Sequence, residues 1–345
     1  LPIFDVYQKK TTDLLISRTL PGSAGFASTY YNQGAMKNNG VELSLNAQII
    51  DKKDWKWSVS GNIGFNKSEI AELGLLPSDF GFLGEKVGYY GNSIGDHFGV
   101  GHVFLEGEAP GLFFGYVTQG IVQPEDITEQ GVKYTKKDGT IGYYQTFNKV
   151  APVAGDIKFV DSDGDGDVNV NDRDVIGDPN PDFTYGFSTN ISWKNLSLSA
   201  SFAGVQGKDI LNTNNRYVNT PGTRSNNLTR KAYQNMWTES NHSNLYPSST
   251  FVIQNYVMDR YVEDASYLRC ADITLNYILP KTWMSKIGFQ NASVYASVKN
   301  AFIITNYSGY DPDVNFFGFD GLRPGVDMGA YPTPRSFIFG LNLTF

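Results

Sequence analysis

The fold class is most clearly indicated by the stretch Phe337-Ile338-Phe339-Gly340-Leu341-Asn342-Leu343-Thr344-Phe345. Its odd-numbered positions are all apolar, and its even-numbered positions from Gly340 onward are small or polar. This period of two predicts a strand with one apolar face. A transmembrane barrel presents such a face to lipid, whereas a soluble sheet has to cover it. The stretch therefore favours an all-β fold, a transmembrane antiparallel β-barrel in the outer membrane of a Gram-negative cell.

The composition is compatible with a barrel and argues against two other classes. Aromatic residues make up 14% of the chain and charged residues only 18%. No run approaches the roughly 18 consecutive apolar residues of a membrane helix, so a helical membrane protein is excluded. The formal net charge of −7 argues against nucleic acid as a partner. The single cysteine, Cys270, falls on the polar-face parity of its strand and is interpreted as a lone structural residue.

Alternation recurs along the chain in pairs of segments that predict hairpins. The predicted pairs are 41–49 with 55–65, 183–193 with 196–202, and 269–278 with 292–302. A further hairpin is expected within residues 98–121, turning near Glu106–Pro110. With the last stretch, these segments predict roughly ten strands.

A soluble β-sandwich is a commoner source of alternating strands, but three details weigh against it here. The polar faces are rich in Ser, Asn, Gly, Thr and Gln rather than in Lys and Glu. Three tryptophans stand beside turns, as in an interfacial aromatic girdle; they are Trp55, Trp57 and Trp193. Short turns alternate with long segments, which cover roughly 68–181, 206–264 and 305–333. Outer-membrane barrels place such long loops outside the cell and short turns in the periplasm.

The long loops are aromatic and rich in Asn, Gly and Tyr. The stretches concerned are Tyr30–Asn32, Asn212–Tyr217, Asn241–Tyr246 and Tyr307–Gly318. This composition fits either irregular loop structure or a surface that binds sugars or peptides through ring stacking and amide hydrogen bonds. The pattern does not single out individual substrate-binding residues.

The most specific local motif is the acidic segment 161–172. It has the spacing of an EF-hand-type calcium loop, with its turn glycine, Gly166, at the expected place. The residues that would hold Ca²⁺ are, in loop order, Asp161, Asp163, Asp165, Asp167 through its main chain, Asn169 and Asp172. The last of these is Asp where sensor loops carry Glu, which shortens its reach and should reduce affinity.

No amphipathic helix is predicted on either side of this loop, so a calcium sensor that opens helices is not expected. A structural clamp on an outward loop is the favoured interpretation, and a solvated acidic turn that binds no ion is the alternative. Elsewhere, no nucleophile–base pair or acid pair can be assembled from motif spacing. The sequence therefore predicts no catalytic residues and a protein that is not an enzyme.

Further motifs are spread over the whole chain. They are Asn39-Gly40-Val41-Glu42-Leu43, Gly155-Asp156-Ile157-Lys158-Phe159-Val160-Asp161, Asp163-Gly164-Asp165-Gly166, Ile176-Gly177-Asp178-Pro179-Asn180-Pro181-Asp182-Phe183, Asp264-Ala265-Ser266-Tyr267-Leu268-Arg269, Lys299-Asn300-Ala301-Phe302 and Tyr307-Ser308-Gly309-Tyr310-Asp311-Pro312-Asp313. With the terminal Phe345, the set resembles the C-terminal half of the SusC/RagA family, the TonB-dependent outer-membrane transporters of Bacteroidetes.

The resemblance implies a barrel of about 22 strands that is plugged by an N-terminal domain and energised through a TonB box. It also implies a SusD-like surface lipoprotein as a lid, and oligosaccharides or peptides as cargo. Residues 1–345 contain neither plug nor TonB box, so they are expected to be the C-terminal part of a longer barrel protein. The terminal Phe345 resembles the signal that the barrel-assembly machinery reads.

The sequence thus predicts nutrient import across the outer membrane, together with a SusD-like lipoprotein and TonB. One alternative is a siderophore receptor or porin without a lid. Another is a secreted, calcium-stabilised β protein that binds glycans. Finding the lipoprotein partner would favour the first interpretation, and solubility without detergent would favour the last.

Overall fold

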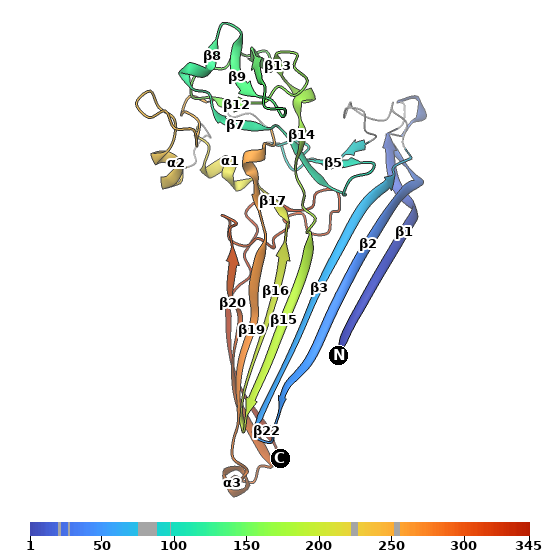
Figure 1. The fold of residues 1–345 in the computed structure, drawn as a ribbon, viewed down its shortest axis with the longest axis vertical. Helices are drawn as coiled ribbons and strands as arrows, with labels where there is room; N and C mark the ends of the chain where they lie inside the picture. Colours follow the sequence, from blue (N-terminus) through green and yellow to red (C-terminus); the bar gives the residue numbers. More distant parts are fainter. Residues whose placement is uncertain (20–21, 27, 75–87, 97, 222–226, 252–255) are drawn as a thin grey trace.

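The molecule has two regions, a long sheet and a crown of shorter elements at one end of it (Figure 1). The computed structural model describes residues 1–345 except 20–21, 27, 75–87, 97, 222–226 and 252–255, several of which fall in the predicted long loops. The crown comprises the described residues of 73–182, 207–266 and 306–335, which connect the long strands at that end. The C-terminus and a short helix lie at the opposite end (Figure 1).

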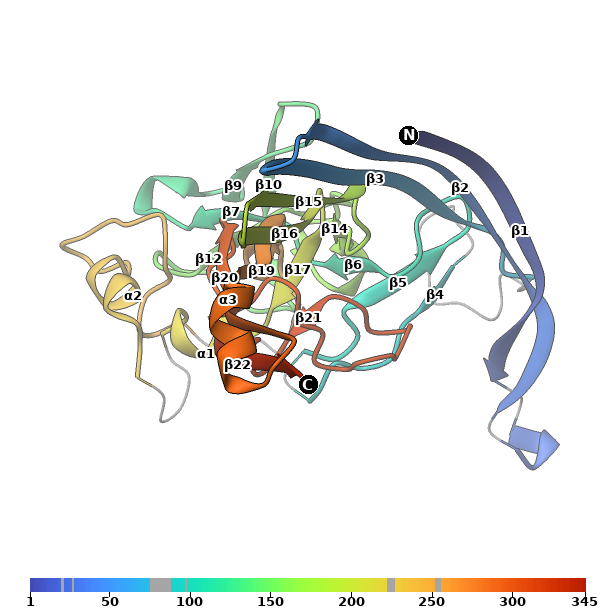
Figure 2. The same cartoon turned by 90° about the horizontal axis from the view of Figure 1, so that it is seen from below.

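The long sheet has eight strands, and every neighbouring pair is antiparallel. In spatial order they are β1 (Pro2–Thr19), β2 (Ser28–Asp51), β3 (Trp55–Glu72), β15 (Phe183–Trp193), β16 (Leu196–Gln206), β19 (Tyr267–Ile278), β20 (Asn291–Thr305) and β22 (Ser336–Thr344). Figure 2 shows the sheet bending as an open arc. Among the described residues β1 and β22 do not pair with each other, so the sheet is part of a barrel rather than a closed one.

The alternation read from the sequence places apolar side chains on one face of this sheet. Cross-strand partners such as Leu43 with Ile63 and Val294 with Leu341 keep that face continuous. The face is not covered, since Leu341 is 58% exposed. The opposite face is polar, and serines contact each other across it, with the Oγ atoms of Ser60 and Ser188 2.6 Å apart. An uncovered apolar face opposite a polar one is the pattern of a barrel wall in lipid.

The described long sheet has eight strands, where the sequence predicts roughly ten in all. The expected hairpin within residues 98–121 does form, as β5 (His102–Leu105) and β6 (Leu112–Gly115), but it belongs to the crown. Each strand has four residues, all of them buried, whereas a strand that spans a membrane needs about 9–11. The stretch Tyr30–Asn32, assigned to a loop from its composition, lies in β2 instead.

The predicted alternation of short and long connections is confirmed. The short connections are residues 52–54, 194–195 and 279–290. The long connections at the other end are residues 73–182, 207–266 and 306–335, within a few residues of the predicted segments. The turn 279–290 carries α3 (Lys281–Met284) and η6 (Ser285–Ile287).

The crown is built from small sheets rather than from irregular loops. Its strands are β4 (Gly88–Tyr90), β5, β6, β7 (Thr118–Ile121), β8 (Ile127–Thr128), β9 (Gly131–Thr135), β10 (Ile141–Tyr144), β11 (Thr146–Phe147), β12 (Ile157–Phe159), β13 (Asp167–Val168), β14 (Asp174–Gly177), β17 (Asp209–Asn212), β18 (Val262–Asp264) and β21 (Val326–Asp327). Its helices are α1 (Asn214–Val218), α2 (Arg230–Gln234), η3 (Pro124–Asp126), η4 (Val170–Asp172) and η5 (Asp259–Tyr261), and η1 (Gly22–Ala24) lies between β1 and β2. Within the described ranges, no helix combines the length and apolarity needed to cross a membrane.

The main hydrophobic core of the molecule lies in the crown. Its centre is aromatic: Tyr116 is fully buried and its ring meets those of Phe147 and Phe159 edge-on, while the latter two stack 4.3 Å apart. Aromatic pairs in these geometries add to the free energy gained by burial alone. The crown therefore holds itself together as a packed body above the sheet.

A β-bulge moves Cys270 away from its predicted face. The pairing of β19 skips Ala271 on both sides, and on the β20 side two residues, 300 and 301, are also left unpaired. Cys270 therefore faces Phe202 and Phe302 across the sheet. Both phenylalanines lie on the apolar face, and Cys270 is fully buried between their strands. The parity assignment to the polar face was wrong because an extra residue in one strand reverses every side chain beyond it.

Candidate functional site

The acidic loop 161–172 sits in the crown and is anchored to its core at both ends. It follows β12 and contains β13 and η4. Within β13, Val168 is fully buried in the main core cluster and pairs with Phe147 of β11. No α-helix flanks the loop, as the sequence predicted. The loop is therefore a fixed part of the crown surface.

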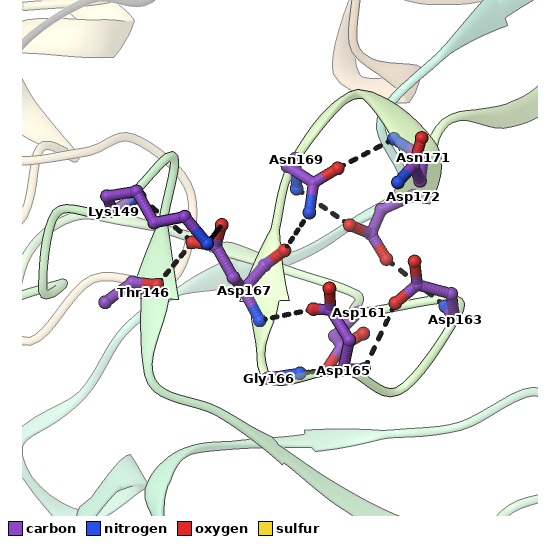
Figure 3. Close-up of polar contacts among 10 residues, drawn as sticks. All are labelled: Thr146, Lys149, Asp161, Asp163, Asp165, Gly166, Asp167, Asn169, Asn171 and Asp172. Atoms are coloured by element: carbon purple, nitrogen blue, oxygen red, sulfur yellow. Dashed lines mark hydrogen bonds and ion pairs between the residues drawn. The ribbon is translucent and has the colours of Figure 1, made fainter.

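Three of the predicted ligands converge. Carboxylate oxygens of Asp161, Asp163 and Asp165 lie within 4.8 Å of one another, as Figure 3 illustrates. Asp161 accepts hydrogen bonds from the backbone N–H groups of Gly164 at 2.7 Å and Gly166 at 2.9 Å. Both glycines have φ near +80 to +90°, a left-handed conformation that other residues rarely adopt. The glycines thus allow the tight curl that turns the three carboxylates together.

Asp172 closes the loop and is not part of this trio. Its Oδ1 accepts from the backbone N–H of Ser162 at 2.6 Å and its Oδ2 from that of Asn169 at 2.7 Å. The carboxyl group is completely buried, and burial raises the pKa of Asp172. In this arrangement Asp172 joins the start of the loop to its end.

Asp167 and Asn169 are also outside the trio. The Asp167 carboxylate turns away to Lys149, whose Nζ lies 2.7 Å from it, and it accepts a hydrogen bond from Thr146 (Figure 3). The hydrogen bond from Lys149 lowers the pKa of Asp167 to about 2. Its main-chain oxygen, the predicted ligand atom, accepts from Asn169 Nδ2 at 2.6 Å. The carboxylate of Asp167 thus points away from the trio, and its role as a ligand through the carbonyl stays a prediction.

A second feature is a cleft of about 810 Å³ where the crown meets the sheet. Two of the Asn- and Tyr-rich stretches, Asn212–Tyr217 and Tyr307–Gly318, meet there, and Tyr246 of a third lines it as well. Sequence reasoning missed the acidic members of the lining, Glu263 and Asp327. No local motif marks them, because their partners are far away in the sequence.

Asp327 forms part of the floor of this cleft. It is buried, and Tyr307 donates its phenolic O–H to Asp327 Oδ2 at 2.6 Å. Burial, together with this bond, raises the pKa of Tyr307. The main-chain oxygen of Asp327 accepts from the N–H of Thr213 at 3.0 Å, which ties β21 to the segment between β17 and α1. The floor is therefore a rigid, internally satisfied polar layer.

Phe345 lies at the end of the molecule that carries the short connections. It follows β22 and is largely exposed, and its ring centroid is 5.0 Å from that of Phe289 in the turn before β20. This agrees with the predicted position at the rim formed by the short turns. Its role as an assembly signal stays a prediction.

The sequence matches a family model described as "TonB dependent receptor-like, beta-barrel" over residues 4–120. A curated relative, TonB-dependent receptor P3 of Formosa agariphila, is 32% identical over 346 residues, which is 99% of this chain and 32% of the relative. TonB-dependent receptor SusC of Bacteroides thetaiotaomicron is 30% identical over 352 residues, which is 99% of this chain and 30% of the relative. The chain thus spans about a third of the length of the curated relatives it matches.

Solved structures with the same fold include the RagAB peptide importer. Its open-open state aligns with a TM-score of 0.73 and 26% sequence identity, over 100% of this chain and 32% of that one. Its closed-closed state aligns with a TM-score of 0.73 and 27% identity, over 100% of this chain and 33% of that one. The alignment takes in the sheet and the crown alike.

Proposed function

We propose that this chain is the β-barrel portion of a TonB-dependent receptor of the SusC/RagA type, and that the full-length protein imports oligosaccharides or peptides across the outer membrane of a Bacteroidetes-like cell. It would act with a SusD-like surface lipoprotein on the crown side. It would draw energy through TonB, which contacts an N-terminal TonB box and plug. No enzymatic step is part of this proposal.

The observation that carries the proposal is the eight-stranded sheet whose apolar face is left uncovered. Such a face is stable in lipid and unstable in water, because exposed apolar surface of this extent drives association. The crown is formed by the long connections at one end of the sheet, which supports an extracellular position for it, and the polar face of the sheet is suited to line a lumen. These features support an outer-membrane importer over a secreted binding protein.

The experiment is a mild-detergent pull-down of the native full-length protein, followed by mass spectrometry of its companions. We expect a SusD-like lipoprotein and heat-modifiable migration of the receptor on a gel. Deleting the gene, or inactivating TonB, should abolish uptake of the same nutrient. A protein that stays soluble without detergent, or uptake that is independent of TonB, would contradict the proposal.

We also propose that the acidic loop binds Ca²⁺ as a structural ion. Asp161, Asp163 and Asp165 already present three carboxylates to one point, and oxygen ligands of this kind suit calcium. Asp172, Asn169 and the carbonyl of Asp167 would complete the set by small rotations away from their present hydrogen bonds. The ion would neutralise the mutual repulsion of the carboxylates and so stiffen the crown surface.

Terbium luminescence of the full-length protein tests the ion site. Terbium should bind and be displaced by Ca²⁺, and the substitution Asp163→Asn should weaken binding about tenfold or more, the factor equal to about 1.4 kcal/mol. Asp174→Asn is the matched control, since Asp174 pairs with Lys137 just beyond the loop. Equal luminescence in both variants would show that the loop is a solvated acidic turn.

A further inference from the structure

We propose that the cleft at the mouth of the sheet, lined by a hydrogen-bonded row of asparagines under Glu263, binds an oligosaccharide rather than a peptide. The inference rests on the import function proposed above and assigns the class of its cargo.

The cleft lies directly above three neighbouring strands of the sheet. Its walls are β17, β18 and the segment after Thr305, which adjoin the crown ends of β16, β19 and β20 respectively. β17 pairs with β18 on one side and with β21 on the other, so the three strands form one small sheet. A ligand held there would stand at the entrance of the lumen that these strands line.

Glu263 of β18 is the centre of the hydrogen bonding in the cleft. Its Oε1 accepts from Asn212 Nδ2 at 2.9 Å and from Asn215 Nδ2 at 2.6 Å. The same carboxylate accepts from the backbone N–H of Ser308 at 2.9 Å and from its hydroxyl at 2.8 Å. Charge-assisted bonds of this kind are stronger than neutral ones. One carboxylate thus fixes side chains from β17, α1 and the loop after β20.

From Asn215 the bonding continues along α1. Asn219 Nδ2 donates to Asn215 Oδ1 at 2.7 Å, and Thr229 Oγ1 donates to Asn219 Oδ1 at 2.7 Å. On the other side Asn214 Nδ2 donates to Asn212 Oδ1 at 3.2 Å. Asn212 Nδ2 also donates to Ser308 Oγ at 3.4 Å, whereas the other amides of the row each donate one of these bonds. A primary amide has two N–H donors and two acceptor lone pairs. The row therefore fixes which way each amide faces while keeping polar capacity for a ligand.

The remaining lining favours sugars. Among the described residues, Val218 is the one aliphatic side chain in the lining, and most of the other side chains are amides, hydroxyls and tyrosines. Tyr310 on the rim is 83% exposed and presents its ring as a flat surface against which a pyranose can pack. Sugar hydroxyls both donate and accept, which matches amide groups held in fixed orientations.

The charges and the size of the cleft agree with this class. Its two carboxylates, Glu263 and Asp327, accept internal hydrogen bonds from neutral groups and keep their negative charge, so the cleft favours neutral sugars over acidic ones. Lys231 and Arg260 add positive charge to the lining. The volume of about 810 Å³ lies within the range of small-molecule sites, about 300–1,000 Å³. A few sugar units, not a folded domain, would fit.

The test uses the purified full-length receptor with any lipoprotein that accompanies it. The immobilised complex is offered two probes, an oligosaccharide pool from partial hydrolysis of plant and algal polysaccharides and a tryptic peptide pool. Retained species are identified by mass spectrometry and their affinities measured by calorimetry. We expect oligosaccharides to be retained, and Tyr310→Ala and Asn215→Ala to weaken their binding about tenfold each.

Tyr233→Ala is the matched control, because Tyr233 is an exposed crown tyrosine that does not line the cleft. It should leave affinity unchanged. Glu263→Gln tests the positioning role: it keeps the size of the side chain but replaces an acceptor with a donor, and should weaken binding while assembly in the membrane is retained.

Three outcomes would overturn the inference. Retention of peptides alone would overturn the sugar assignment and leave the import function standing. Oligosaccharide binding that is equal in Tyr310→Ala, Asn215→Ala and Tyr233→Ala would place the site elsewhere. Retention of neither pool would show that the cleft is not a binding site for either class. Failure of the import function would be seen separately, as nutrient uptake that does not depend on the gene or on TonB.

Discussion

The long sheet and the crown differ in the exposure of their apolar side chains. On the sheet Phe339 is 79% exposed and Leu341 is 58% exposed. In the crown Phe113 and Tyr116 have no exposed surface at all. Both regions are made of strands, and both are rich in aromatics. The difference fits the proposed surroundings of each region, which are lipid around the sheet and the protein's own interior within the crown.

This contrast explains why the two regions differ in how far sequence reveals them. In the sheet, neighbours along the chain are neighbours in space, and period two is enough to assign the faces. In the crown, β6 pairs with β14 and β17 pairs with β21, partners separated by long stretches of chain. Their strands are two to five residues long, which is too short for a periodic signal.

The largest expected effect separates the two regions by truncating one phenylalanine in each. Phe113→Ala should cost about 3–5 kcal/mol of crown stability, because the cavity it leaves is closed off from solvent. Phe339→Ala on the apolar face of the sheet should cost about 0.5 kcal/mol or less, since lipid fills the space. Limited proteolysis of the full-length protein across a temperature series measures crown opening. Equal losses for the two variants would mean that the apolar face of the sheet is covered by protein.

The next effect distinguishes the two faces of the sheet. Leu341→Arg should destabilise the barrel by about 2–4 kcal/mol, the cost of a basic residue facing the middle of the membrane. Asn342→Arg, one residue further along on the polar face, should change stability by about 0.5 kcal/mol or less. Denaturant titration of the full-length protein in lipid vesicles measures both. A larger loss of stability for Asn342→Arg than for Leu341→Arg would show that the lumenal and lipid-facing sides of the sheet are assigned the wrong way round.

A pH titration is expected to affect the crown alone. Burial lowers the pKa of His102 to about 4, while a hydrogen bond from its ring to the main-chain oxygen of Pro324, 2.8 Å away, opposes that change. In the unfolded chain the imidazole of His102 takes up a proton below its ordinary pKa of about 6.5. In the folded crown, burial disfavours this protonation. Crown stability should therefore be full above about pH 6.5 and fall by up to about 3 kcal/mol as the pH drops to 4.

Two histidine variants check the origin of this slope. His102→Phe should flatten it while lowering stability at neutral pH, because Pro324 loses its hydrogen-bond partner. His242→Phe should keep the slope, since His242 is exposed and stacks on Trp237 at the crown surface. A slope that survives in His102→Phe would assign the titration to a group other than His102. Asp259 would not be that group, because burial raises its pKa and so makes its contribution to stability increase as the pH falls.

For the candidate sites, sequence reasoning found the residues that share a local motif and missed those joined by tertiary contacts. The spacing of Asp161, Asp163 and Asp165 predicted their convergence, because a tight loop brings alternate side chains together. It did not predict that Lys149 holds Asp167 or that Glu263 joins Asn212 to Ser308. These partners come from different segments, and only the pairing of the crown strands brings them into contact.

The smallest expected effect concerns the bulge that strict alternation cannot foresee. Because Cys270 lies between the strands of Phe202 and Phe302 on the apolar face, Phe302→Ala should uncover it toward lipid at a cost of about 1 kcal/mol or less. In membranes, a lipid-soluble maleimide should then label Cys270 faster than in the unmodified protein, whereas a charged maleimide should not. Thr274→Ala on the polar face is the control and should change neither rate. Labelling of the unmodified protein by the charged reagent would show that Cys270 lies on the polar face of the sheet, and would contradict the β-bulge.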